Sequence, residues 1–267
     1  MMKIKLIAVD LDGTLLRSDH QIGENTQQLL SQLSKTGIKI VPTSGRPLTG
    51  VLPYAEALDL TGENYAVLYN GALVQNLTGK KLVRHGLDQA SAIALLKVQQ
   101  LTQSNLHFMR EDGFFTLDHR LSLQMAKSSF LTSLPLIIMP QVPADFSYLK
   151  AEFTGTPDEM DQLGAAFPAW LSNQYNVARS DPQIWELNTP LASKGNAVHE
   201  LAARLGIEDD EVVVFGDQGN DLSMFQNPNF FKVAMGNATS ALKERANLVT
   251  KTNDDEGIYD ALERLMA

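Results

Sequence analysis

The sequence contains no cysteine, which excludes disulfide bonds, thiolate metal sites and a cysteine nucleophile. Its longest apolar run beyond the first strand-like segment, Leu134 to Met139, is far too short to span a bilayer. Basic residues are also scarce, since 22 Lys and Arg stand against 31 Asp and Glu and the formal net charge is -9. No block of Lys and Arg exceeds two residues, so neither nucleic acid nor an anionic membrane is an expected partner.

The apolar segment near the start of the chain is interrupted by Asp10 and Asp12 before the core of a signal peptide could form. We therefore expect an unexported, cytoplasmic protein, whose oligomeric state the sequence leaves open. A chain of 267 residues can bury a full core and is long enough for two domains.

In two stretches of the chain, strand patterns alternate with helix patterns, which is typical of a protein with a parallel sheet. In residues 1–83 we expect strands at Lys3 to Val9, Ile38 to Val41 and Tyr65 to Tyr69, and a helix at Glu24 to Lys35. In residues 189–267 we expect strands at Glu211 to Phe215 and Phe231 to Ala234, with helices at Lys194 to Leu205, after Asp221, near Thr239 to Arg245 and at Glu256 to Leu265. These stretches predict two halves of one Rossmann-like α/β core domain.

The pattern changes between residues 84 and 188, where we expect an inserted α+β cap domain. Helices are predicted at Gln89 to Thr102, Leu121 to Phe130 and Pro157 to Trp170. Strands are predicted at Leu106 to Arg110, Phe114 to Asp118, Tyr148 to Phe153, Asn176 to Ala178 and Gln183 to Leu187.

The acidic pair Asp10 and Asp12 follows a strand whose carboxyl end, in a parallel sheet, opens on the ligand-binding edge. Residues two apart on an extended or bulged chain point the same way, so both side chains can enter one pocket. By themselves they fit a solubilising turn equally well.

Three further segments stand at the carboxyl ends of predicted core strands or open a helix beside them. They are Ser44-Gly45-Arg46, Lys194-Gly195 and Gly216-Asp217-Gln218-Gly219-Asn220-Asp221. Each alone is typical of an ordinary loop or helix start, but together they bring carboxylates, a hydroxyl, an amide and a cation to one edge.

This set suits phosphoryl transfer with Mg²⁺, which prefers hard oxygen ligands. Asp10, the backbone carbonyl of Asp12 and Asp217 can hold the metal, and Asp221 can steady them from behind. Asp10 is placed to attack phosphorus, and Asp12 to act as general acid and base. The groups that can bind the phosphate are the backbone at Leu11 and Gly45, the Ser44 hydroxyl, Lys194 and the Asn220 amide.

The four segments, with Asp10-Leu11-Asp12-Gly13-Thr14-Leu15 as the first, resemble the signature motifs of the haloacid dehalogenase superfamily. The insertion between the second and third motifs, preceded by Tyr69-Asn70-Gly71-Ala72, resembles its Cof-like branch with a large α+β cap of class IIB type. The resemblance implies a Mg²⁺-dependent phosphatase acting on a small phosphorylated metabolite such as a sugar phosphate. It also implies that Arg46 and Asn70 reach the substrate.

Specificity is expected in the cap, where Arg110, Glu111, Arg179 and Trp185 are candidates because they flank predicted strands. The five histidines have no metal-ligand spacing and are expected to be structural or exposed. Two other functions remain open, namely a phosphomutase of the same fold and a phosphate-binding or receiver-type protein without catalysis.

Overall fold

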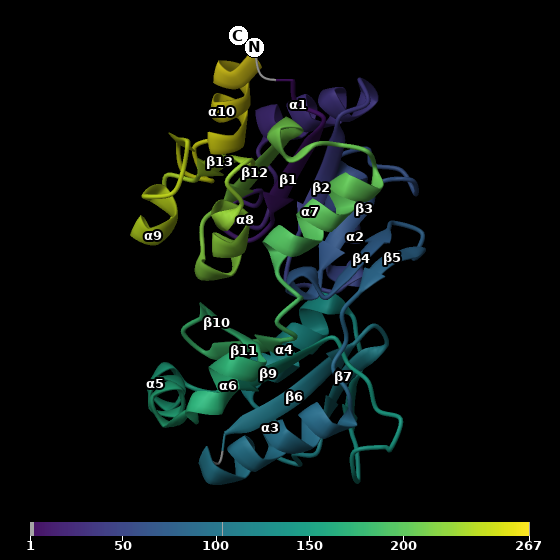
Figure 1. Cartoon of the computed structure of the whole chain (residues 1–267), viewed down its shortest axis with the longest axis vertical. Helices are drawn as coiled ribbons and strands as arrows, with labels where there is room; N and C mark the ends of the chain where they lie inside the picture. Colours follow the sequence, from purple (N-terminus) through teal and green to yellow (C-terminus); the bar gives the residue numbers. More distant parts are fainter. Residues whose placement is uncertain (1–2, 103, 267) are drawn as a thin grey trace. The chain divides into compact units, whose positions relative to one another are not determined.

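The computed structural model describes residues 3–102 and 104–266 and divides into two compact units. The core unit comprises Met1–Val83 and Ser193–Ala267, and the inserted unit comprises Arg84–Ala192 (Figure 1). The segment 189–192, expected in the core, therefore belongs to the inserted unit. No helix in the described parts of the chain is long and apolar enough to cross a membrane.

The core unit is built on a sheet with the strand order β14-β13-β12-β1-β2-β3-β4-β5. The strands are β1 (Leu6–Asp10), β2 (Lys39–Thr43), β3 (Tyr65–Leu68), β4 (Leu73–Asn76), β5 (Lys81–Arg84), β12 (Val212–Gly216), β13 (Phe231–Ala234) and β14 (Leu248–Val249). From β14 to β3 all neighbours pair in parallel, whereas β4 runs antiparallel to β3. The central strands β1 and β12 are buried along their whole length, as expected for a sheet covered on both faces.

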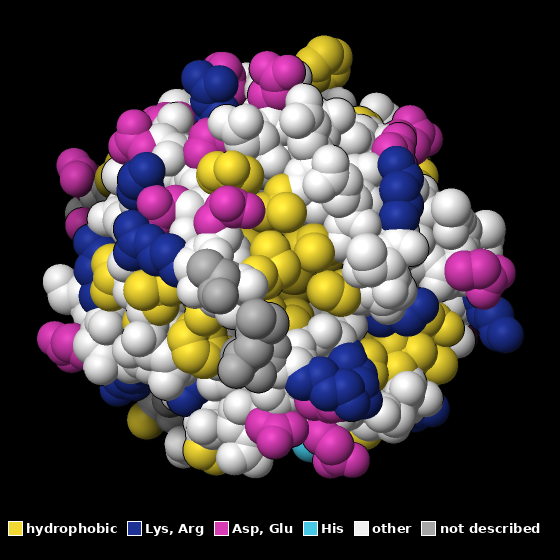
Figure 2. Space-filling model, turned by 90° about the horizontal axis from the view of Figure 1, so that it is seen from above, with side chains coloured by type: hydrophobic (Ala, Val, Ile, Leu, Met, Phe, Trp, Pro, Cys, Tyr) yellow, Lys and Arg dark blue, Asp and Glu magenta, His cyan; other side chains and the backbone are white. Residues whose placement is uncertain are grey.

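In the core unit, α1 packs against α10, and α7 packs against α8, which also contacts α9. Their bounds are α1 (Glu24–Lys35), α2 (Leu52–Ala57), α7 (Lys194–Arg204), α8 (Leu222–Gln226), α9 (Ser240–Lys243) and α10 (Gly257–Met266). Helix α1 begins and ends at the predicted residues, and Gly37 follows its C-cap with a φ of 99°, a conformation that glycine adopts without strain. On the face of the core shown in Figure 2, Lys and Arg side chains are interspersed with Asp and Glu.

The inserted unit contains a second sheet with the order β10-β11-β9-β6-β7-β8. Its strands are β6 (Asn105–Arg110), β7 (Gly113–Thr116), β8 (Leu136–Ile138), β9 (Lys150–Thr154), β10 (Asn176–Asp181) and β11 (Ile184–Asn188). Its helices are α3 (Gln89–Thr102), α4 (Leu123–Thr132), α5 (Pro157–Ala166) and α6 (Ala169–Gln174). The apolar core of this unit includes Leu95, Phe108, Phe153 and Leu187.

The structure confirms the predicted fold class, an α/β protein with a parallel-stranded core sheet and a second, mixed sheet in the insertion. Some elements differ from the expectation. The predicted helix from Pro157 to Trp170 is two helices, because Pro168 has no N–H to continue α5 and instead caps α6. Strands β4, β5, β8 and β14 were not predicted, since each shows too few alternations between apolar and polar residues to be recognised from the sequence.

Candidate active site

The carboxyl ends of four neighbouring parallel strands carry the polar residues that the sequence singled out. Asp10 ends β1, Ser44 follows β2, Asn70 follows β3 in a 3₁₀ turn, and Asp217 follows β12. Because β12, β1, β2 and β3 are adjacent in the sheet, the parallel register brings these residues to one edge. All four side chains are almost completely buried.

Lys194 supplies the cation of this edge from the first residue of helix α7. Ser193 caps the helix by accepting a hydrogen bond from the Asn196 N–H, and this fixes the backbone that carries Lys194. The Lys194 ammonium is fully buried and donates to Asp10 Oδ1 at 2.5 Å and to Asp221 Oδ1 at 2.7 Å. Burial lowers the pKa of Lys194, but the two carboxylates outweigh it and raise that pKa.

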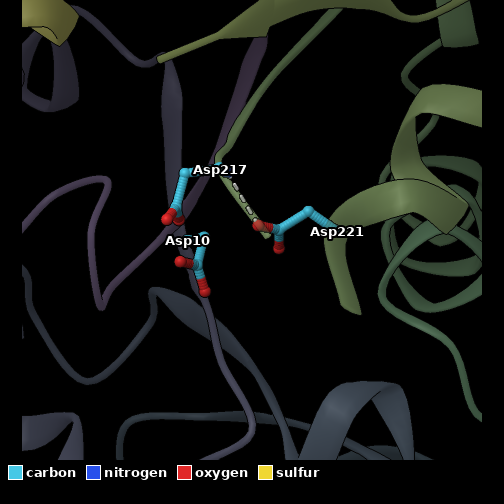
Figure 3. Close-up of side chains that lie close together, drawn as sticks. All are labelled: Asp10, Asp217 and Asp221. Carbon is cyan, nitrogen blue, oxygen red and sulfur yellow. Dashed lines mark hydrogen bonds between the residues drawn. The ribbon is translucent and has the colours of Figure 1, made fainter. Parts of the chain in front are cut away.

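Three carboxylates converge beside this ammonium (Figure 3). One oxygen from each of Asp10, Asp217 and Asp221 lies within 4.8 Å of the others, and all three residues are buried. Asp221 is held from inside the protein, because its Oδ2 accepts hydrogen bonds from the N–H groups of Asp217 at 3.0 Å and Gln218 at 3.1 Å. Its side chain makes no capping bond to α8, although the residue occupies the N-cap position of that helix.

The charge of this cluster is incompletely balanced. Burial, together with the charges of Asp221 and Asp217, raises the pKa of Asp10 well above its usual value. Burial and Asp221 raise the pKa of Asp217 to about 6. Because Lys194 offers one positive charge to three carboxylates, the ionised cluster lacks the two charges that a divalent cation carries. A buried, all-oxygen donor set of this kind fits Mg²⁺.

Asp12 lies outside the three-carboxylate group, although it is only two residues from Asp10. Its side chain is 52% exposed, and both carboxylate oxygens accept hydrogen bonds from the Arg46 guanidinium, one of them at 2.9 Å from Nε. Arg46 also lies over the Tyr54 ring, at 5.6 Å from its centroid. The arginine expected to face substrate is thus, in this structure, the partner of the expected acid/base residue.

The remaining predicted phosphate-binding groups lie around this edge. Asn220 donates a 3.4 Å hydrogen bond to Asn70, whose φ of 57° places it in the left-handed region. The Ser44 hydroxyl accepts from the Arg46 N–H at 3.1 Å, and Gly45, between them, is half-buried. The Leu11 carbonyl accepts from the N–H of Leu16, which closes the turn after Asp10.

Two glycines at this edge are required by close packing. A Cβ on Gly13, whose φ is 80°, would lie 2.5 Å from Asp217 Oδ2, so only glycine lets the Asp10 loop approach that carboxylate. The neighbouring Thr14 hydroxyl donates to Asp217 Oδ1 at 2.9 Å. A Cβ on Gly195 would lie 2.2 Å from the Ser223 carbonyl, so this glycine serves the contact of α7 with α8.

The inserted unit contains a second buried charge cluster that sequence reasoning missed. The Lys150 ammonium lies 2.6 Å from both Glu152 Oε1 and Glu186 Oε1, and His107 Nε2 lies 3.0 Å from Glu152 Oε2. Each of these residues is at most 5% exposed. Their alternation along β6, β9 and β11 predicts a shared sheet face, but the sequence alone does not show that this face is buried.

The four candidate cap residues differ in their contacts. Arg179 bonds Asp161 and lies over the Trp185 ring, and Trp185 donates to the Met160 carbonyl at 2.8 Å. Both therefore hold the inserted unit together. Arg110 pairs with Asp112 at 3.0 Å, while Glu111 is exposed.

Comparison with known proteins settles the family. The model of haloacid dehalogenase-like hydrolases matches residues 7–262. The chain belongs to this family. It is 35% identical over 268 residues to "Putative phosphatase YxeH" of Bacillus subtilis, with 98% of each chain covered. It is also 28% identical over 241 residues to an HMP-PP phosphatase of Serratia proteamaculans, covering 90% of this chain and 86% of that one. The resemblance inferred from the four motifs is confirmed, and the protein is a phosphatase of this family.

Solved structures agree with this assignment. A haloacid dehalogenase-like hydrolase from Bacteroides thetaiotaomicron superposes with a TM-score of 0.85 at 28% identity, covering 98% of this phosphatase and 100% of that chain. The subclass IIB sugar phosphatase BT4131 superposes with a TM-score of 0.81 over 98% and 99% of the two chains. Its identity of 22% supports the shared fold alone.

Proposed function

We propose that this phosphatase depends on Mg²⁺ and hydrolyses small phosphorylated metabolites, sugar phosphates among them, through an aspartyl-phosphate on Asp10. The observation that carries the proposal is the buried group of Asp10, Asp217 and Asp221 around the single ammonium of Lys194. An anionic pocket of this kind becomes suited to an anionic phosphate once a divalent cation balances it.

The metal would be held by the carboxylates of Asp10 and Asp217 and by the backbone carbonyl of Asp12. Asp221 supports them from the second layer, because its Oδ2 already accepts the backbone N–H groups of Asp217 and Gln218. When bound, the cation orients the phosphate and offsets the repulsion between that anion and the attacking carboxylate.

The proposed reaction has two steps, in which Asp10 and Asp12 have different roles. In the first, an Asp10 carboxylate oxygen attacks phosphorus, the bond to the leaving oxygen breaks, and Asp12 donates a proton to that oxygen. In the second, Asp12 removes a proton from a water that attacks the phosphorus, so that inorganic phosphate leaves and Asp10 is restored. Arg46 donates hydrogen bonds to both oxygens of Asp12, so the Asp12 carboxylate must leave this pairing before it can transfer a proton to the leaving oxygen.

The transferring phosphoryl group requires donors for its equatorial oxygens. We assign these to the Lys194 ammonium, the Ser44 hydroxyl, the Asn220 amide and the backbone at Leu11 and Gly45. Asn70 is held beside Asn220 by their hydrogen bond and completes the polar lining.

The names of two relatives support the proposed substrate class. One 27% identical protein of Bacillus subtilis, covering 99% of both chains, is named 5-amino-6-(5-phospho-D-ribitylamino)uracil phosphatase YwtE. Together with the HMP-PP phosphatase, it supports a phosphorylated metabolite of modest size. We assign discrimination among such substrates to the inserted unit.

The proposal is tested by a panel of phosphorylated metabolites incubated with the purified protein, with Mg²⁺ or with a chelator. We expect phosphate release from some sugar or polyol phosphates that the chelator abolishes and added Mg²⁺ restores. Release that is unaffected by chelation contradicts the metal dependence. Transfer that requires a sugar bisphosphate, with no net phosphate release, shows a phosphomutase.

A further inference from the structure

The turn that follows Asp10 is held at both ends by asparagine side chains from distant parts of the core unit. Asn237 Nδ2 donates to the Gly13 carbonyl at 2.8 Å, and Asn253 Nδ2 donates to the Leu16 carbonyl at 2.8 Å. The two asparagines are themselves joined, because the Asn253 N–H donates to Asn237 Oδ1 at 3.1 Å. The chain 13–16 is therefore closed into a ring of side-chain and backbone hydrogen bonds.

The orientation of the Asn237 amide is fixed by its partners. One partner is a backbone carbonyl, which can only accept, and the other is a backbone N–H, which can only donate. The side chain therefore bridges the Asp10 loop and the C-terminal loop in one defined orientation.

The segment that carries Asn237 also holds the backbone of the Asp217 loop. The Met235 N–H donates to the Gly216 carbonyl at 3.1 Å, and the Thr239 N–H donates to the Asp217 carbonyl at 3.0 Å. Asn237 lies between these two contacts and reaches across to Gly13, so one short segment braces both loops that bear metal-binding carboxylates.

The contact between those loops is tight enough for such a brace to matter. Gly13 approaches Asp217 so closely that a Cβ there would lie 2.5 Å from its carboxylate, and Thr14 donates to the other carboxylate oxygen. A shift of the Gly13 carbonyl would move Thr14 and release Asp217 from its fixed orientation. Groups behind the direct ligands that orient them typically change metal affinity when they are removed.

We propose that Asn237 is a positioning residue for the metal site, acting with Asn253 to set the distance between the Asp10 loop and Asp217. This inference rests on the proposed function, since it requires a divalent cation at Asp10 and Asp217. Neither asparagine belongs to the motifs that identified the family.

The test measures binding of Mn²⁺, a spectroscopic substitute for Mg²⁺, to the resting full-length protein by electron paramagnetic resonance, without substrate. We expect Asn237→Ala to weaken binding about 10-fold. Asn237→Asp should weaken it as well, because this variant keeps the acceptor for Asn253 but loses the donor to Gly13. Asn253→Ala should weaken binding less, because it removes only the donor to Leu16 and keeps the backbone N–H that Asn237 accepts. The double variant should weaken binding more than Asn237→Ala, because the two side chains hold different carbonyls.

Asn247 offers a matched control, since its Oδ1 also accepts a backbone N–H, that of Lys232 at 2.9 Å, away from the site. Asn247→Ala should lower the thermal midpoint of the chelated protein while leaving Mn²⁺ affinity within twofold of wild type, that is, within about 0.4 kcal/mol. Wild-type Mn²⁺ affinity in both Asn237 variants, whatever their thermal midpoints, would overturn the inference and leave the proposed function intact. Absence of Asp10-dependent binding in the wild type would contradict both.

Discussion

Each unit of this phosphatase buries one lysine between two carboxylates, yet the two clusters differ in charge balance. In the core unit, Lys194 lies between Asp10 and Asp221, with Asp217 as a third acid whose pKa is raised to about 6. In the inserted unit, Lys150 lies between Glu152 and Glu186 at 2.6 Å from each.

In the inserted unit, the buried Glu152 carboxylate is stabilised by neighbouring side chains of the same cluster. Burial alone would raise the pKa of Glu152, but Lys150 and His107 outweigh it and lower that pKa. In the core cluster burial and like charge raise the pKa of both Asp10 and Asp217. The same pairing of a buried lysine with two acids therefore occurs in both units, and the third acid, Asp217, distinguishes the cluster that we propose as the metal site.

The largest expected effect is the loss of turnover when Asp10, the proposed nucleophile, is replaced, compared with the replacement of another acid of the core unit. Asp10→Asn should lower turnover of a phosphate monoester by more than about 10⁴-fold, because an amide cannot form the aspartyl-phosphate. The exposed Asp210 provides the control, and Asp210→Asn should leave turnover unchanged. Steady-state phosphate release at saturating Mg²⁺ measures both. Substantial activity in Asp10→Asn would remove the role assigned to this residue.

Replacing each buried lysine tests the difference in charge balance directly. Lys150→Met and Lys194→Met should each cost about 3–5 kcal/mol, because either change leaves two buried acids without their cation. Magnesium should recover part of that loss in Lys194→Met, since the cation takes over charge compensation there. Thermal midpoints with and without Mg²⁺ measure this. The increase in thermal midpoint on adding Mg²⁺ should be the same in Lys150→Met as in wild type. An equal increase in all three proteins would contradict the difference between the two clusters.

Removing the third acid should leave the core cluster with one lysine and two acids, as in the cluster of the inserted unit. Asp217→Asn should raise the Mg²⁺ concentration needed for half-maximal activity by at least about 10-fold, because one metal-binding oxygen becomes a neutral amide oxygen. A metal titration of activity measures the shift. An unchanged metal requirement would argue against Asp217 as a ligand.

The smallest expected effect is a pH dependence of opposite sign in the two clusters. Since the pKa of Asp217 is raised from 3.8 to about 6, its contribution to stability is complete below pH 3.8 and is lost as pH rises through about 6. Glu152 has a lowered pKa, so its contribution is present above 4.5 and is lost in acid. Because an ionised Asp217 binds the cation better, the increase in thermal midpoint on adding Mg²⁺ should be larger at pH 7.5 than at pH 5, and at both pH values Glu152 keeps its contribution. An increment that does not change with pH would contradict this account.

The core cluster was predictable because the parallel sheet converts sequence order into spatial order. Residues that end β1 and β12 must meet at one edge, and Lys194, which opens α7, reaches the same place. The pairing of Arg46 with Asp12 was not predictable, because a motif fixes which residues are near but not which partner a long side chain selects.

The remaining features depend on contacts between residues that are far apart in the chain, and a single sequence does not reveal such contacts. Lys150 and Glu186 each lie between apolar neighbours on their strands, as solvent-facing residues would. Only the structure shows that their face of the sheet is buried. Asn237 and Asn253 act on backbone atoms more than 200 residues away, and side chains that bind backbone leave no pairing pattern in the sequence.

The most direct test of the central claim is the covalent state of Asp10 during turnover. Asp12→Asn should slow the second step, so acid quenching after mixing with Mg²⁺ and a reactive aryl phosphate should trap one phosphoryl group on the protein. Mass spectrometry should then find it on the peptide that contains Asp10, and the double variant with Asp10→Asn should carry none. Phosphate release by the wild type, with no label on that peptide in Asp12→Asn and with Asp10→Asn still active, would contradict the account.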